Sequence, residues 1–338
     1  MESREKMKDK EVNVLITSAG RRGALVKCFQ ESIKRIEKAQ GKIFAIDVNP
    51  LSAALYICDK YYIVPCVSDK NYISTLIKIC KKENIKLIIP TIDTELLILS
   101  HNKKKFKEIG TIIVVSNSES IKICRDKLKT FKFFIENNIP TVKTFSREQI
   151  DEINDLKFPK FIKPCYGSGG KNTFKINNKK ELDFYKDYID NPVIQEFAKG
   201  QEFTLDVLAD LHGKVVNVVP RERIEIRAGE VNKGKTVKDQ RLIKFGKMIV
   251  EKLGGIGPIT IQCFIKDDEI KFTEINPRFG GGYPLSFAAG ANYPELLIRM
   301  ALEESITARL GEFEENLIML RWEDAVFIKG NHKKEDRD

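Results

Sequence analysis

The chain has 338 residues, of which 42% are hydrophobic and 31% are charged, a balance typical of a globular protein with two or three domains. Its formal net charge of +10 comes from lysines and arginines spread along the whole chain, which argues against a nucleic-acid-binding protein and suits anionic small molecules. No apolar run is long enough to span a membrane, and the charged start MESREKMKDK does not resemble a secretion signal.

Short apolar strands alternate with helical stretches in the first 125 residues. The expected helices cover about residues 22–38, 71–83 and 94–107, and the expected strands are VNVLITSAG, KIFAIDVNP, YYIVP, KLIIPTID and TIIVVS. This alternation predicts a doubly wound parallel α/β sheet over residues 1–125. Ligands bind at the carboxyl ends of such strands, so TSAGRRG and PTIDTE, with Asp93 and Glu95, are candidate substrate contacts.

A second unit is expected over residues 126–197. A helix over about 126–137 ends at NNIPT, where asparagine and proline are stop signals. A strand, a glycine-rich loop and a strand follow in KFPKFIKPCYGSGGKNTFKI, and a helix over 179–188 and the strand PVIQEF complete the unit. This order predicts a small lobe that carries a glycine-rich loop.

From residue 198 the pattern changes to longer alternating strands. EFTLDVLAD, KVVNVVP and RERIEIRAGEV precede a helix over 237–253, and the strands GPITIQCFI and EIKFTEIN follow it. Strands grouped in this way predict an antiparallel sheet with a site on its face over residues 198–328, before a charged tail at 329–338.

The cysteines are odd in number and include no C-x-x-C pair. This argues against a disulfide framework or a zinc knuckle and predicts a reducing, cytoplasmic compartment. Most of them are expected to be small buried hydrophobic residues. They are Cys28, Cys58, Cys66, Cys80, Cys124, Cys165 and Cys263.

The last predicted strand ends in polar residues, KFTEINPRFGGGYP. Alternation along a strand places Phe272, Glu274 and Asn276 on one face, and Gln262 on the preceding strand could reach the same face. Carboxylate and carboxamide oxygens suit Mg²⁺, and Arg278 could then grip a phosphate oxygen. A solvated strand end with a turn at Asn276 is an equally good interpretation.

Two further stretches fit a nucleotide. Lys163 ends an apolar strand, and the backbone N–H groups of the next loop can approach phosphate closely; its residues are Gly167, Ser168, Gly169 and Gly170. Glu196 and Glu202 flank a linker that could offer backbone groups to a base and a carboxylate to a ribose. Each stretch alone could equally be a turn or a charged loop, and no Walker A motif is present.

The acceptor site is less defined. Arg221, Arg223 and Arg227 have the spacing of one strand face, either an exposed basic surface or a clamp for an acidic substrate. Gly281 and Gly282 would let the backbone approach the same substrate closely.

In order, these motifs resemble the ATP-grasp family. The resemblance covers about residues 110–325, and the first domain is similar to the parallel-sheet domain that precedes the grasp in those enzymes. The chain looks most similar to single-unit proteins resembling one half of the carbamoyl-phosphate synthase large chain.

The resemblance implies a role for each matching position. Lys127 and Lys163 would contact ATP phosphates beneath a flap from Gly167 to Lys171. The hinge Glu196, Phe197 and Ala198 would read adenine. Glu202 would contact ribose, Arg278 would contact the γ-phosphate, and Mg²⁺ or Mn²⁺ would be held by Gln262, Glu274 and Asn276.

The implied reaction is ATP-dependent ligation of a carboxylate to an amine through an acyl phosphate, with Arg278 and Lys163 as catalytic residues. Its partners would be small molecules rather than nucleic acid or membrane, with a homodimer possible. Three alternatives stay open: carbamoyl-phosphate-type activation of bicarbonate with ammonia, a nucleotide-binding regulator without turnover, and a nucleotide-binding oxidoreductase suggested by Gly20 and Asp47.

Overall fold

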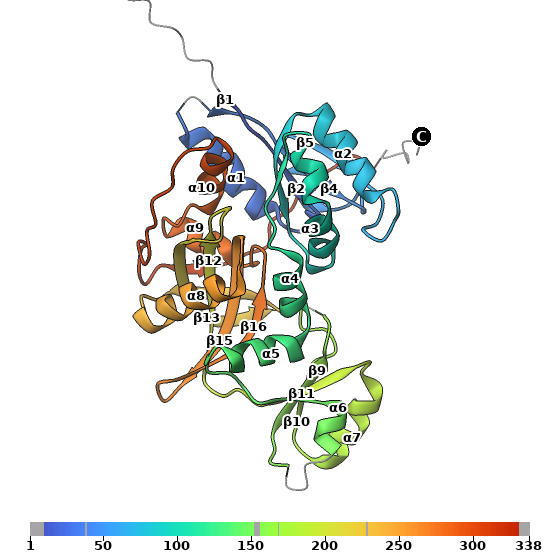
Figure 1. Cartoon of the computed structure of the whole chain (residues 1–338), viewed down its shortest axis with the longest axis vertical. Coiled ribbons are helices and arrows are strands. Elements are labelled where there is room, and N and C mark those ends of the chain that lie inside the picture. The colour runs from blue at the N-terminus through green and yellow to red at the C-terminus, as the bar shows by residue number, and fades with distance from the viewer. Residues whose placement is uncertain (1–9, 38, 152–155, 168, 228, 331–338) are drawn as a thin grey trace, which may run out of the picture.

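The computed structural model describes residues 10–330 except 38, 152–155, 168 and 228. It contains an N-terminal α/β domain, a small lobe and a large antiparallel sheet (Figure 1). The chain is therefore the mixed α/β protein that the sequence predicts, with a parallel sheet followed by antiparallel ones.

The N-terminal domain is built on a parallel sheet in the order β5-β4-β2-β6-β7. Alternate side chains of its central strand pack on opposite faces, Val14 and Ile16 in the core that includes α1, and Leu15 in the core of α2 and α3. A strand covered on both faces explains the nearly continuous apolar run in the sequence. The strands are β2 (Asn13–Thr17), β4 (Ile43–Asp47), β5 (Lys60–Ile63), β6 (Ile85–Pro90) and β7 (Ile112–Ile113).

Helices cover this sheet, and a short parallel pair lies beside it. The helices are α1 (Gly23–Arg35), the 3-10 helix η1 (Ala53–Tyr56), α2 (Tyr72–Lys82), α3 (Asp93–Lys107) and α4 (Ser118–Arg125). The short pair is β1 (Lys10–Glu11) and β3 (Ala39–Gln40).

The small lobe is an antiparallel sheet in the order β10-β9-β11-β8, packed on α6 and α7. Its own apolar core includes Ile162, Leu182 and Ile194. The helix α5 (Lys127–Glu136) precedes the lobe and packs on the large sheet through Phe134 and Phe272. The lobe contains β8 (Thr144–Ser146), α6 (Arg147–Asp151), β9 (Lys160–Pro164), β10 (Phe174–Ile176), α7 (Lys179–Tyr188) and β11 (Pro192–Glu196).

The large sheet has the order β16-β15-β12-β13-β14-β17 and is antiparallel throughout. The helix α8 (Gln240–Leu253) packs on β12 and β13, where Gly246 lies against Val218 and Leu205. Two helices follow the last long strand, α9 (Tyr283–Ala288) and α10 (Tyr293–Ala301). The strands are β12 (Gln201–Ala209), β13 (Val215–Arg227), β14 (Glu230–Thr236), β15 (Gly257–Lys266), β16 (Glu269–Asn276) and β17 (Ile318–Leu320).

One strand prediction was wrong. KVVNVVP and RERIEIR form one continuous strand, β13, that passes through Pro220. The carbonyl of Pro220 accepts from the Val237 N–H on the β14 side, just beyond the end of β14. Its nitrogen therefore faces that same side, and the ladder to β12 is not interrupted.

All seven cysteines are free thiols, and five of them are buried. Within the described ranges, none of the helices combines the length and the apolar character needed to cross a membrane.

Candidate functional site

Two cavities lie side by side over the large sheet, and both are lined by Gly169, Arg223, Gly229, Gln262 and Glu274. The larger, of about 370 Å³, lies between the small lobe and the sheet and is called the nucleotide cavity below. The smaller, of about 240 Å³, lies between the sheet and the N-terminal domain and is called the acceptor cavity. Gln262 and Glu274 are therefore at the boundary of the two cavities.

The shared corner is formed by two neighbouring strands. Gln262 on β15 lies directly opposite Glu274 on β16, and Thr260 lies opposite Asn276, so these four side chains share one face of the sheet. The prediction that Gln262 reaches the face of Glu274 and Asn276 agrees with this register.

The expectation that Phe272 shares this face was wrong. Cys263 pairs with Phe272 although its neighbour Gln262 pairs with Glu274, so Thr273 is an extra, bulged residue. The bulge reverses the alternation. Phe272 is therefore fully buried against Phe245 on the opposite face, whereas Thr273 and Glu274 both line the nucleotide cavity.

The donor set at this corner fits Mg²⁺ or Mn²⁺ bound together with a nucleotide. Within the described residues, Glu274 accepts no hydrogen bond and forms no ion pair, and no group of three or more His, Cys, Asp or Glu side chains gathers around a point. One carboxylate with the amide oxygens of Gln262 and Asn276 leaves coordination positions for phosphate oxygens, as Mg²⁺ prefers.

Three lysines line the nucleotide cavity, Lys127, Lys163 and Lys171. Lys163 is nearly buried at the end of β9, and burial lowers the pKa of its ammonium to about 8, partly opposed by Glu274. Lys127 begins α5 and donates from Nζ to the Gly167 carbonyl at 3.0 Å. Asp126 caps the same helix through the Leu128 and Lys129 N–H groups, which fixes the start of α5 beside the loop.

The glycine-rich loop lies over both cavities. Gly167, Gly169 and Gly170 all have positive φ, a conformation that favours glycine. A Cβ on Gly229, in the β13–β14 turn, would lie 2.9 Å from the Gly169 carbonyl oxygen, so the loop and the turn meet above the sheet. Ser168 lies outside the described residues.

The predicted hinge lines the nucleotide cavity through Glu196, Phe197 and Ala198. The Glu196 carboxylate itself pairs with Lys271 at 2.8 Å. The cavity walls also include Phe161 and Phe264, and apolar walls of this kind suit a flat aromatic base. Its lining residues bring together Lys127, Lys163, Gly167, Gly169, Gly170, Glu196, Phe197, Ala198, Glu202, Gln262 and Glu274.

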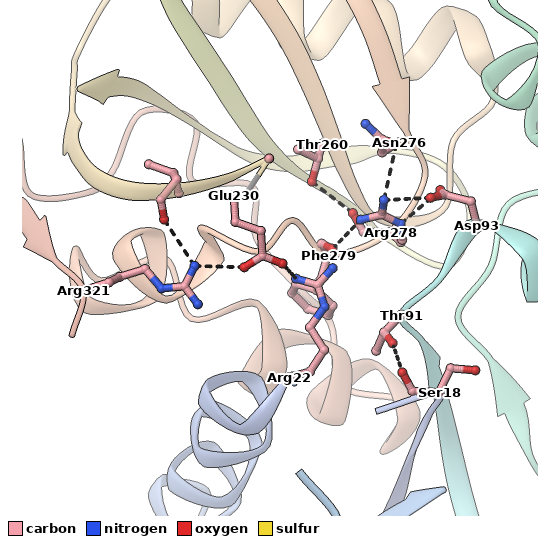
Figure 2. Close-up of polar contacts among 12 residues, drawn as sticks. Ser18, Arg22, Thr91, Asp93, Glu230, Thr260, Asn276, Arg278, Phe279 and Arg321 are labelled. Atoms are coloured by element: carbon pink, nitrogen blue, oxygen red, sulfur yellow. Dashed lines mark hydrogen bonds and ion pairs between the residues drawn. The ribbon is translucent and has the colours of Figure 1, made fainter. Parts of the chain in front are cut away.

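The acceptor cavity is lined by four arginines with different partners, and Figure 2 shows two of them, Arg22 and Arg278. Arg278 donates to both carboxylate oxygens of Asp93, from Nε at 3.0 Å and from Nη2 at 2.7 Å. Arg221 is 1% exposed and forms a two-donor pair with Asp206. Arg223 pairs with Glu202, the residue predicted to contact ribose, and this pair lies between the two cavities.

Arg227 does not belong to this group, contrary to the expectation of a single arginine face. Two register shifts between Arg223 and Ile226 break the alternation along β13. The Arg227 side chain is 71% exposed, pairs with Glu323 and lines neither cavity.

Gly281 and Gly282 border the acceptor cavity and are needed for space. A Cβ on Gly282 would lie 2.3 Å from Arg221 Nη1, and one on Gly281 would lie 3.0 Å from Arg22 Nη1. The backbone at these two positions can therefore pass this close to the guanidinium groups only because glycine has no side chain.

The N-terminal domain contributes contacts that sequence reasoning found only in part. Asp93 lies in the cavity wall, whereas Glu95 is fully buried, accepts hydrogen bonds from Ser18, Tyr72 and the Thr91 N–H, and shapes the β6–α3 turn. Arg22 also lines the cavity and was not singled out, although it lies in the TSAGRRG stretch at the end of the first strand.

Comparisons with known proteins agree with the fold. Residues 14–114 match the model of PylC-like N-terminal domains, and residues 124–282 match an ATP-grasp domain model. The formate-dependent phosphoribosylglycinamide formyltransferase of Prochlorococcus marinus (strain NATL2A) is 26% identical over 267 residues, which cover 70% of this chain and 67% of that protein.

Two further comparisons extend this result. The carbamoyl phosphate synthase large chain of Clostridium acetobutylicum is 24% identical over 279 residues, 76% of this chain but 25% of its own length. The biotin carboxylase domain dimer of 2-oxoglutarate carboxylase from Hydrogenobacter thermophilus, solved with MgADP and bicarbonate, superposes with a TM-score of 0.70 at 16% identity, covering 90% of this chain and 73% of that one. At that identity, the structural likeness concerns the fold.

Proposed function

The chain belongs to the ATP-grasp family of ATP-dependent ligases and carries a PylC-like N-terminal domain, and on this premise we propose that it joins a carboxylate to an amine through an acyl phosphate. ADP and phosphate are the other products. The observation that carries the proposal is that Gln262 and Glu274 line both cavities. A phosphoryl group could therefore pass from a nucleotide on one side to an acid on the other.

In this proposal, ATP binds in the nucleotide cavity. The base lies between apolar walls near the Glu196–Ala198 hinge, and Lys127 and Lys163 hold the phosphates beneath the glycine-rich loop. Glu274, Gln262 and Asn276 would hold Mg²⁺ or Mn²⁺, which when bound would neutralise phosphate charge. Glu202 reaches the ribose while it pairs with Arg223.

The chemistry needs positioning and charge neutralisation rather than a protein nucleophile. An oxygen of the acid attacks the γ-phosphorus, the bond from this phosphorus to the bridging oxygen breaks, and ADP leaves. Arg278 and Lys163 stabilise the transferring phosphoryl group. The amine nitrogen then attacks the acyl carbon and loses a proton, and phosphate leaves.

A second candidate follows from the similarity to the carbamoyl phosphate synthase large chain. Bicarbonate would replace the organic acid and ammonia the amine. ADP release that depends on bicarbonate alone among the acids would favour this candidate. A homodimer and a cytoplasmic location remain predictions for either reaction.

The test is ADP release by the purified protein with MgATP, screened against pools of amino acids, hydroxy acids and bicarbonate with amines or ammonia. Glu274→Ala is expected to abolish release while the protein stays folded. Glu269→Ala is the matched control, because it removes an exposed carboxylate from the same strand outside both cavities. Normal turnover in Glu274→Ala would contradict the metal assignment, and nucleotide binding without any turnover would favour a regulator.

A further inference from the structure

Arg22 differs from the other arginines of the acceptor cavity in its hydrogen bonds. Arg278 is held by Asp93, Arg221 by Asp206, and Arg223 by Glu202 and the Gly229 carbonyl. Within the described part of the chain, the Arg22 side chain makes no hydrogen bond. Its one ion pair is with Glu230 at 3.9 Å, beyond hydrogen-bond distance, although the side chain is only 20% exposed.

The position of Arg22 directs it into the cavity. It directly follows the turn after β2 and precedes α1, at the carboxyl end of the parallel sheet. Figure 2 shows it reaching from α1 toward Glu230, with Arg278 and Asp93 beyond. Gly281 leaves the space that its Nη1 occupies. A planar group with five donors is therefore held in place without acceptors for them.

The charge around Arg22 is unbalanced. Arg22, Arg278 and Arg321 gather near two carboxylates, Asp93 and Glu230. Burial lowers the pKa of the Arg22 guanidinium, and repulsion by Arg278 lowers it further. An anion between Arg22 and Arg278 would reduce their mutual repulsion and would accept the hydrogen bonds that Arg22 can donate.

We propose that Arg22 binds a second carboxylate of the substrates, distinct from the carboxylate that is phosphorylated. Arg278 lies at the metal end of the cavity beside Asn276, whereas Arg22 faces Gly281 and Glu230. This assignment rests on the proposed ligase function and narrows its substrates. The second carboxylate belongs either to a dicarboxylic acid or to an amine that is itself an amino acid.

Binding to the protein saturated with MgADP tests the assignment, because MgADP fills the nucleotide cavity and leaves the acceptor cavity open. The first arm compares succinate and glutarate with butyrate and valerate, acids of equal length with one carboxylate fewer. The second arm compares glycine and β-alanine with methylamine and ethylamine. Calorimetric dissociation constants are measured for the wild type, for Arg22→Gln and for Arg21→Gln. Arg21 is the matched control, since it is the exposed neighbour outside the cavity.

The wild type is expected to bind the compound with the additional carboxylate more tightly in one of the two arms. A preference in the first arm places the carboxylate bound by Arg22 on the acid, and a preference in the second arm places it on the amine. Arg22→Gln should raise the dissociation constant of that compound about tenfold or more, as expected for lost charge-assisted hydrogen bonds, whereas Arg21→Gln should raise it about twofold at most. Equal binding of both members in both arms, or a preference that survives Arg22→Gln, would overturn the assignment. Failure to bind MgADP would instead contradict the proposed function.

Discussion

Replacing Asp93 by alanine is expected to reduce turnover without reducing nucleotide affinity. Asp93 accepts two charge-assisted hydrogen bonds from Arg278, with side chains only 17% and 13% exposed. Such bonds contribute about 1.5–3 kcal/mol each, but two bonds within one pair are not additive. We expect a total effect of about 2–3 kcal/mol on the transition state, or roughly 30–150-fold in kcat/KM. The nucleotide cavity does not include Asp93.

The assay is ADP release with the identified substrates, together with a separate MgADP titration. Glu108→Ala is the control, because Glu108 is an exposed carboxylate at the other end of the same helix. The reasoning would be refuted if kcat/KM for Asp93→Ala stayed within about twofold of the wild type, or if MgADP affinity fell as much as kcat/KM.

Three further predictions concern residues around the two cavities. Asp206→Ala leaves the buried Arg221 without its carboxylate and should lower the free energy of unfolding in urea by about 3–5 kcal/mol; a loss below about 1 kcal/mol would contradict this account. Gly282→Ala would place a methyl group 2.3 Å from Arg221 Nη1. The KM for the acid should therefore rise while the affinity for MgADP is unchanged. Unaltered kinetics would disprove the close approach. The pKa of Lys163 is about 8 without nucleotide and should rise beside phosphates, so ATP binding above pH 8 should take up a proton and weaken as the pH increases. Calorimetry in two buffers of different ionisation enthalpy measures that proton, which Lys163→Gln should abolish; uptake that persists in this variant would assign the proton elsewhere.

Most of the long strands and helices and the order of the motifs were readable from the sequence, but details of the site that depend on strand register were not. Alternation correctly places Glu274 and Asn276 on one face, and it wrongly adds Phe272. A bulge depends on how two strands pair, and Thr273 carries no local signal of it. The same limit applies to β13, where register shifts direct Arg227 away from Arg221 and Arg223.

The contacts between domains could not be predicted for a different reason. Asp93 and Arg278 are 185 residues apart, and Arg22 and Glu230 meet across the same domain boundary. Hydrophobic periodicity predicts each element but not how two domains face each other. The position of PTIDTE and TSAGRRG at strand ends was the available signal, and it indicated the right edge of the sheet without indicating partners.

The most direct test of the proposed ligase is trapping of the acyl phosphate with hydroxylamine, which replaces the amine so that only the acid needs to be screened. With the correct acid and MgATP, hydroxamate and ADP are expected in equal amounts, and both should disappear in Glu274→Ala but not in Glu269→Ala. ADP formation without hydroxamate for every acid that stimulates turnover would contradict an acyl phosphate formed between the two cavities.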